Sequence, residues 1–111
     1  MIRNLTRGTV LAEKPKLALA FAWRCRGMIG RRFDGFDALV FPRCWSIHTA
    51  FMGMPLDVVF LDRAGTVLRV CEALAPWRLA SALTAATVIE LPAGRLRTVP
   101  VRVADRLLIE I

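Results

Sequence analysis

The sequence CWSIHTAFMGMPLDVVFLDRAG, residues 44–65, decides what kind of fold this chain can form. It contains Asp57–Leu61, a run of β-branched, aromatic and aliphatic residues that is apolar on both faces of an extended chain. Such a run predicts a central strand covered on both sides. The loop after it ends at Gly65, and glycine tolerates the positive φ that a hairpin turn needs. Thr66–Val70 is therefore predicted to be the return strand.

The N-terminal half adds short strands and one helix. Residues 1–12 predict two strands joined by a turn that ends at Gly8. From Leu17 to Gly30 the apolar residues recur at helical spacing with arginines opposite, which predicts an amphipathic helix. Ala38–Phe41 is predicted to be a short buried strand that Pro42 ends.

The C-terminal half is predicted to be mostly strands. Residues 79–86 suggest a turn of helix, and Thr87–Leu91 a strand. Val99–Val103 alternates around Pro100, which predicts an edge strand, and residues 107–111 alternate as the last strand. The whole pattern predicts a mainly β protein, a sandwich or partly closed barrel of about eight short strands with one amphipathic helix packed on it.

Length and composition point to a single domain spanning residues 1–111, because a second domain would leave neither half an adequate core. The chain is 56% apolar, yet its longest apolar run, Leu17–Trp23, is far shorter than the roughly 20 residues that a membrane span needs. No secretory signal is recognised in this run, since arginines follow it instead of a cleavage site. Three irregularly spaced cysteines fit reduced thiols, so we expect a cytoplasmic protein.

The net charge of +7 comes mainly from arginines in the first half of the chain. Four of them form a candidate patch for an anionic partner: Arg24, Arg26, Arg31 and Arg32. A solvated basic face that keeps an apolar protein soluble is the simpler interpretation. Nucleic acid is not favoured as a partner, because the sequence contains no helix-turn-helix or aromatic–basic RNA-binding pattern.

The sequence offers no complete metal or catalytic signature. Cys44 and His48 form the one closely spaced ligand pair, and in an extended segment they would be ~13 Å apart at ~3.3 Å per residue, too far to share an ion. We therefore predict no metal site and no cofactor. A small hydrolase or transferase that uses His48 with Asp57 or a cysteine is the alternative to a non-enzymatic protein. Asp57, at the start of a buried strand, is more simply explained as a carboxylate that accepts backbone N–H bonds.

A binding site is predicted around the only histidine. Trp45–Thr49 should be extended, so Ser46 and His48 would point away from Ile47. Tryptophans could then wall a pocket for a small polar ligand, or a surface for a protein partner. The candidate binding residues are Trp45, Ser46, His48, Met52, Asp57 and Trp77. The preferred hypothesis is thus a small non-enzymatic ligand-binding or protein-interaction module.

Four blocks of this sequence, in order and spacing, resemble one protein family. They are Arg26–Arg31 (RGMIGR), Ser46–Asp62 with its SIHT, Met52 and PLDVVFLD elements, Pro76–Arg78 (PWR) and Val88–Gly94 (VIELPAG). Together they are similar to the uncharacterised "domain of unknown function 192" family, over about Asn4 to Leu108. The resemblance implies a single small β-rich fold and supplies no reaction, since the family has no assigned activity.

The sequence departs from the family pattern near its end. Relatives usually have Gly-Asp where this chain has Ala104-Asp105, and they tend to have a glycine where Pro100 and Val101 stand. A site that required close approach to the backbone there would be weakened by these substitutions. A turn that tolerates alanine would be unaffected.

Overall fold

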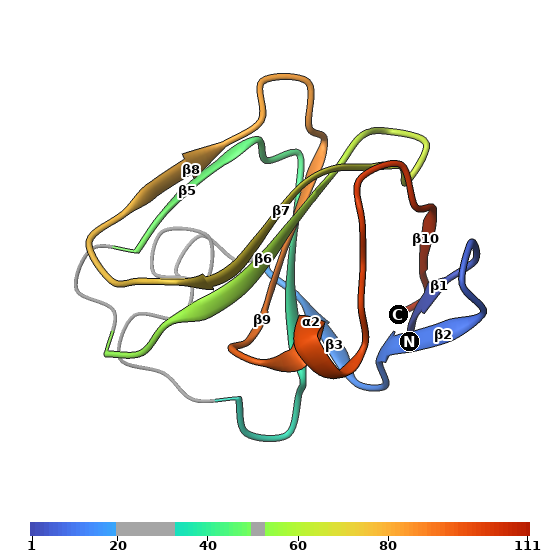
Figure 1. The fold of residues 1–111 in the computed structure, drawn as a ribbon, viewed down its shortest axis with the longest axis horizontal. Helices are drawn as coiled ribbons and strands as arrows, with labels where there is room; N and C mark the ends of the chain where they lie inside the picture. The colour runs from blue at the N-terminus through green and yellow to red at the C-terminus, as the bar shows by residue number, and fades with distance from the viewer. Residues whose placement is uncertain (20–32, 50–52) are drawn as a thin grey trace.

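The computed structural model describes residues 1–19, 33–49 and 53–111, which form a mainly β protein (Figure 1). Its strands lie in three sheets, and no closed barrel forms in this part of the chain. The elements are β1 (Ile2–Asn4), β2 (Thr9–Ala12), β3 (Pro15–Leu17), β4 (Ala38–Pro42), β5 (Ser46–His48), β6 (Leu56–Leu61), β7 (Val67–Leu74), β8 (Leu79–Ser81), β9 (Thr87–Pro92), helix α2 (Arg95–Thr98) and β10 (Leu107–Ile109).

The largest sheet has the order β3-β4-β9-β6-β7, and it is antiparallel except between β3 and β4. All six residues of β6 are buried, which confirms the predicted central strand. The predicted hairpin is also present: the Asp62 carboxylate accepts hydrogen bonds from the backbone of Ala64 and Thr66, and Gly65 has a φ of +84°. Short polar side chains stabilise turns in this way.

Each face of this sheet has its own apolar core. On one face, alternate residues of β4, β6 and β9 pack against Ile2, Leu11 and Leu107 of the small β10-β1-β2 sheet and against Leu96 of helix α2. On the other face, the intervening residues pack against Ile47 of β5 and Ala80 of β8. Figure 1 shows the β5–β8 pair and the small sheet at opposite ends of the molecule. Strand alternation across a doubly covered sheet produces these two cores.

Three sequence-based predictions need correction or fall outside the described residues. Residues 79–86 do not form a helical turn: β8 pairs with β5 there, because burial of Ala80 opposite Ile47 outweighs local helix propensity. Val99–Val103 is not a strand, since its Arg102 N–H is bound by the Asp105 carboxylate and the chain curls back. The helix predicted over Leu17–Gly30 begins at the last residue of β3, residues 18 and 19 are not helical, and residues 20–30 lie outside the described residues.

Substitution of two small residues with positive φ should change the free energy of unfolding in opposite directions. A Cβ on Gly65 would lie 2.5 Å from the Leu107 carbonyl oxygen, whereas the exposed Ala104 already carries a Cβ at φ +77°. We expect Gly65→Ala to lower the free energy of unfolding by roughly 2–4 kcal/mol, through strain and a steric clash. Ala104→Gly should raise it by about 1 kcal/mol, because glycine removes the left-handed penalty. Urea unfolding measures both changes, and shifts of equal sign would contradict this account.

Candidate functional site

The candidate site residues that the structure brings together belong to the β5–β8 pair. In this pair His48 lies opposite Leu79, and Ser46 lies opposite Ser81. Directly opposed side chains lie on one face of a sheet, so His48 and Leu79 share the face that points away from the core. Ile47 packs inward, while His48 is exposed. The predicted alternation of this segment is therefore confirmed.

Thr49, which is fully buried, fixes the loop that carries Trp77. Its hydroxyl donates to the Ala75 carbonyl oxygen at 2.7 Å and accepts a hydrogen bond from the Arg78 backbone N–H at 2.8 Å. Its own N–H donates to the Arg78 carbonyl oxygen, and its carbonyl accepts from the Trp77 N–H. Trp77 is thereby held at φ +64°, a conformation that is rare and costly for a bulky residue.

Large apolar side chains are exposed around the β5–β8 pair. Trp45 is 49% exposed, Trp77 62%, Leu79 73% and Leu83 82%. Trp45 and Leu83 adjoin one end of the pair, where the Ala82 N–H donates to the Trp45 carbonyl oxygen, and Trp77 adjoins the other. We call these four residues, with His48, the β5–β8 surface. All five side chains are exposed to solvent.

Asp57 does not join this surface. Its side chain lies on the opposite face of the large sheet, where its two carboxylate oxygens accept hydrogen bonds from the backbone N–H groups of Ala73 (2.7 Å) and Leu96 (2.8 Å). Asp57 is 1% exposed, and these bonds satisfy a carboxylate that would otherwise be costly to bury. The structure therefore does not bring His48 and Asp57 together as an acid–base pair, and it supports the structural role expected for Asp57.

The remaining candidates are two cysteines in the described part of the chain and five residues outside it. The Cys44 thiol donates to the Ser46 carbonyl oxygen at 3.3 Å, and Cys71 is a free thiol in β7. Within residues 1–19, 33–49 and 53–111, no three His, Cys, Asp or Glu side chains gather as metal ligands, and no helix is long and apolar enough to span a membrane. Met52 and the predicted arginine patch (Arg24, Arg26, Arg31 and Arg32) lie outside the described residues.

In the predicted strand Thr87–Leu91, Glu90 alternates with Ile89 and Leu91, which predicts that its side chain faces solvent or an arginine; the structure buries it instead. β9 is an interior strand between β4 and β6, so Glu90 is 4% exposed among apolar neighbours such as Leu39 and Val58. Its Oε2 accepts no hydrogen bond within the described structure. Burial raises the pKa of this carboxyl to about 8, so the folded protein holds Glu90 mainly protonated at neutral pH.

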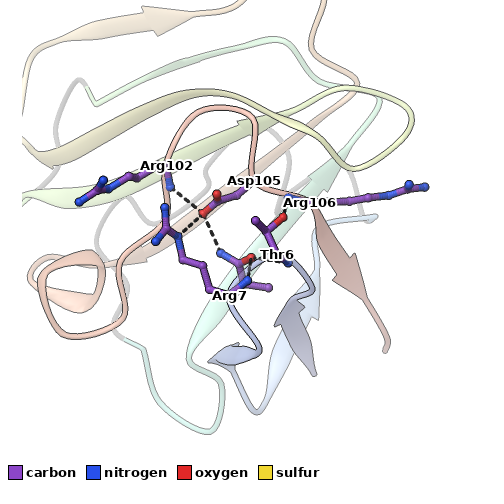
Figure 2. Close-up of polar contacts among 6 residues, drawn as sticks. Thr6, Arg7, Arg102, Asp105 and Arg106 are labelled. Atoms are coloured by element: carbon purple, nitrogen blue, oxygen red, sulfur yellow. Dashed lines mark hydrogen bonds and ion pairs between the residues drawn. The ribbon is translucent and has the colours of Figure 1, made fainter.

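A third buried acidic side chain, that of Asp105, to which the sequence assigned no role, organises the C-terminal loop. Asp105 Oδ2 accepts hydrogen bonds from Arg7 Nε (2.6 Å) and the Arg102 backbone N–H (3.0 Å), as Figure 2 shows. It also accepts one from Asn4 Nδ2 (3.0 Å). Burial alone would raise the pKa of Asp105, but these hydrogen bonds and the Arg7 charge outweigh it and lower the pKa. The preceding Ala104 adopts positive φ, so the turn keeps a glycine-like conformation despite the alanine.

Thr49→Val tests whether the buried hydroxyl holds the Trp77 loop. The substitution preserves shape but leaves the Ala75 carbonyl and the Arg78 N–H without that partner, so we expect a loss of about 1–3 kcal/mol in unfolding free energy. Time-resolved tryptophan anisotropy should also show faster local motion. Thr84→Val, at an exposed turn position, is the control and should change neither quantity. Unchanged stability and anisotropy in Thr49→Val would contradict the assigned role.

Glu90→Gln tests the buried carboxyl through pH. Because the pKa of Glu90 is about 8 in the folded protein and near 4.5 when unfolded, its contribution to stability falls as pH rises between these values. The slope should approach about 1.4 kcal/mol per pH unit. We expect Glu90→Gln to lack this decline. The unfolding free energy of the variant relative to wild type should therefore rise from pH 5 to pH 8 and then level off. Urea titrations across pH 5–9 measure the unfolding free energy of both proteins, and Glu72→Gln, at an exposed position, is the control. Parallel pH profiles of wild type and Glu90→Gln would refute this prediction.

Comparison with known proteins agrees with this architecture. The DUF192 family, described as "Uncharacterized ACR", matches residues 4–109. The UPF0127 protein TK1120 of Thermococcus kodakarensis is 36% identical over 111 residues, covering 95% of this chain and 70% of the relative.

Two solved structures share the fold. One is a "putative transcription regulator" from Sinorhizobium meliloti (TM-score 0.73, 24% identity, 85% of this chain and 79% of that one). The other is a protein of unknown function from Novosphingobium aromaticivorans (TM-score 0.72, 19% identity, 86% and 74%). With matched sequence blocks, a family match over nearly the whole chain and the same β architecture, this protein belongs to the DUF192 family of uncharacterized proteins.

Proposed function

We propose that this protein is a small non-enzymatic interaction module that binds a protein partner through the β5–β8 surface. The observation that carries the proposal is the exposure of Trp45, Trp77, Leu79 and Leu83 around a single strand pair. Exposed apolar clusters of this kind are typical of binding surfaces, and tryptophan is enriched among residues that dominate binding energy. The strained φ of Trp77 adds support, since such strain concentrates at functional positions.

Charge indicates the chemistry of the partner. The chain has a net charge of +7, and exposed Arg78 lies between Trp77 and Leu79. We therefore expect a partner with an apolar patch bordered by acidic side chains. We place the module in the cytoplasm, in keeping with the free thiols of Cys44 and Cys71.

The arrangement of polar groups supports a non-enzymatic role. The catalytic alternative needed His48 beside Asp57 or a cysteine, and Asp57 lies on the other face with both oxygens bonded. Catalysis by paired groups requires them within hydrogen-bond reach. The Cys44 thiol is hydrogen-bonded within its own segment. An interaction surface requires none of these groupings, so it fits the geometry more simply.

The test measures affinity for a purified partner. A protein retained from cell extract by the wild-type chain is identified, purified and titrated against variants. We expect Trp77→Asn, which suits positive φ, and Leu79→Ser each to weaken binding at least about tenfold. Leu108→Ser is the matched control, because Leu108 is 43% exposed on β10 at the far end of the molecule, and it should bind as wild type.

Two results would overturn the proposal. One is equal affinity of the Trp77 and Leu79 variants and wild type for the purified partner. The other is a small polar compound that stabilises the protein thermally and loses its effect in His48→Ala, since this would assign the site to a small ligand.

A further inference from the structure

A groove of about 600 Å³ lies on the other side of the large sheet, away from the β5–β8 surface. One wall is β7, represented by Val70 and Glu72, and the other is helix α2 with the loop that follows it. Half-buried Val70 and exposed Val103 supply apolar contact area, while the lining residues Leu96 and Val101 are almost fully buried in the core on this face of the sheet. A volume of this size is in the usual range for ligand sites.

Two unpaired cations line this groove. Arg97 and Arg102 have exposed side chains, and neither guanidinium has a hydrogen-bond or ion-pair partner among the described residues. Asp105 holds the Arg102 backbone in place, and Figure 2 shows the Arg102 side chain extending away from that carboxylate. Glu72 contributes one negative charge, so the groove retains a net positive charge. Charge complementarity therefore favours an occupant that carries a carboxylate.

The backbone of β7 gives the groove a second kind of binding group. β7 is the last strand of the large sheet. At Val67, the first residue of β7, the outer edge of the strand is hydrogen-bonded to the C-terminal loop. The Val67 N–H donates to the Asp105 carbonyl oxygen, and the Val67 carbonyl accepts from the Ala104 N–H. Beyond Val67 no other described strand pairs with that edge. An open strand edge beside a groove is the arrangement that extended peptides use when they add to a sheet.

We propose that this groove binds an extended acidic peptide, which adds alongside β7 and places a carboxylate between Arg97 and Arg102. An apolar side chain two residues from the carboxylate would lie on the same face of the peptide, over Val70. Recognition thus combines backbone pairing, one apolar contact and a charge-assisted contact. This site is independent of the β5–β8 surface and needs none of its residues.

The experiment titrates the full chain with a fluorescein-labelled Thr-Val-Thr-Glu-Thr-Val peptide blocked at both ends, and follows anisotropy. We expect Arg97→Gln and Arg102→Gln each to weaken binding at least about fivefold. A matching peptide with Gln in place of Glu should bind wild type at least about fivefold more weakly than the Glu peptide does. With the Arg97→Gln/Arg102→Gln double variant the two peptides should differ little in affinity, because the contact between the carboxylate and the arginines is already lost. Arg63→Gln, an exposed arginine outside the groove, removes the same charge and should leave affinity unchanged.

A peptide with N-methylated backbone amides separates strand addition from simple anion binding. It should lose binding, because methylation removes the donors that pair with β7. Equal binding of the methylated peptide would overturn strand addition and leave a site for small carboxylates only. Failure of the unmodified peptide to bind at millimolar concentration, or an equal loss in Arg63→Gln, would refute the groove as a peptide site. Thermal unfolding of each variant confirms that the fold is retained.

Discussion

The buried carboxylate of Asp57 is the interaction on which much of this structure depends. It lies in a strand whose six residues are all buried, where an unpartnered carboxylate would be very costly. Its two oxygens are satisfied by the N–H of Ala73, which sits at φ +49° in an irregular part of β7, and by the N–H of Leu96 in helix α2. One side chain therefore ties the central strand to an edge strand and to the only helix of the described residues, which are also the two walls of the groove.

The doubly covered sheet separates the chemistry of the chain into two compartments. Alternate residues of β6 and β9 face different cores, so side chains that are adjacent in sequence contact different sets of residues. Asp57 faces the small sheet and helix α2, while His48 lies on the layer that covers the other core. This separation explains why a cluster of reactive residue types in sequence does not become a catalytic cluster in space. It also leaves two separate surfaces, one with exposed apolar side chains and one lined by Arg97 and Arg102.

Much of the strand framework could be predicted from sequence. Asp57–Leu61 was identifiable because it is apolar on both faces, and the hairpin after it because Asp62 and Gly65 have distinctive turn chemistry. Residues 79–81 were not, since alanine-rich segments favour helix locally and only pairing with β5 makes them a strand. Glu90 was misplaced for a related reason: alternation gives the face on which a side chain lies, but not whether another layer covers that face. The exposure of Trp77, Leu79 and Leu83 likewise had no local signal.

The sequence by itself determined the fold class, the central strand, the turns and family membership, because these depend on local propensity, periodicity and short motifs. Only the tertiary structure decided which polar residues meet. Asp57 binds an N–H 39 positions away in sequence, and Asp105 binds Asn4 across 101 positions. Such contacts depend on how the layers stack, because stacking decides which polar groups are buried and which hydrogen-bond partners lie near them. The pattern of residues along the chain does not give this directly.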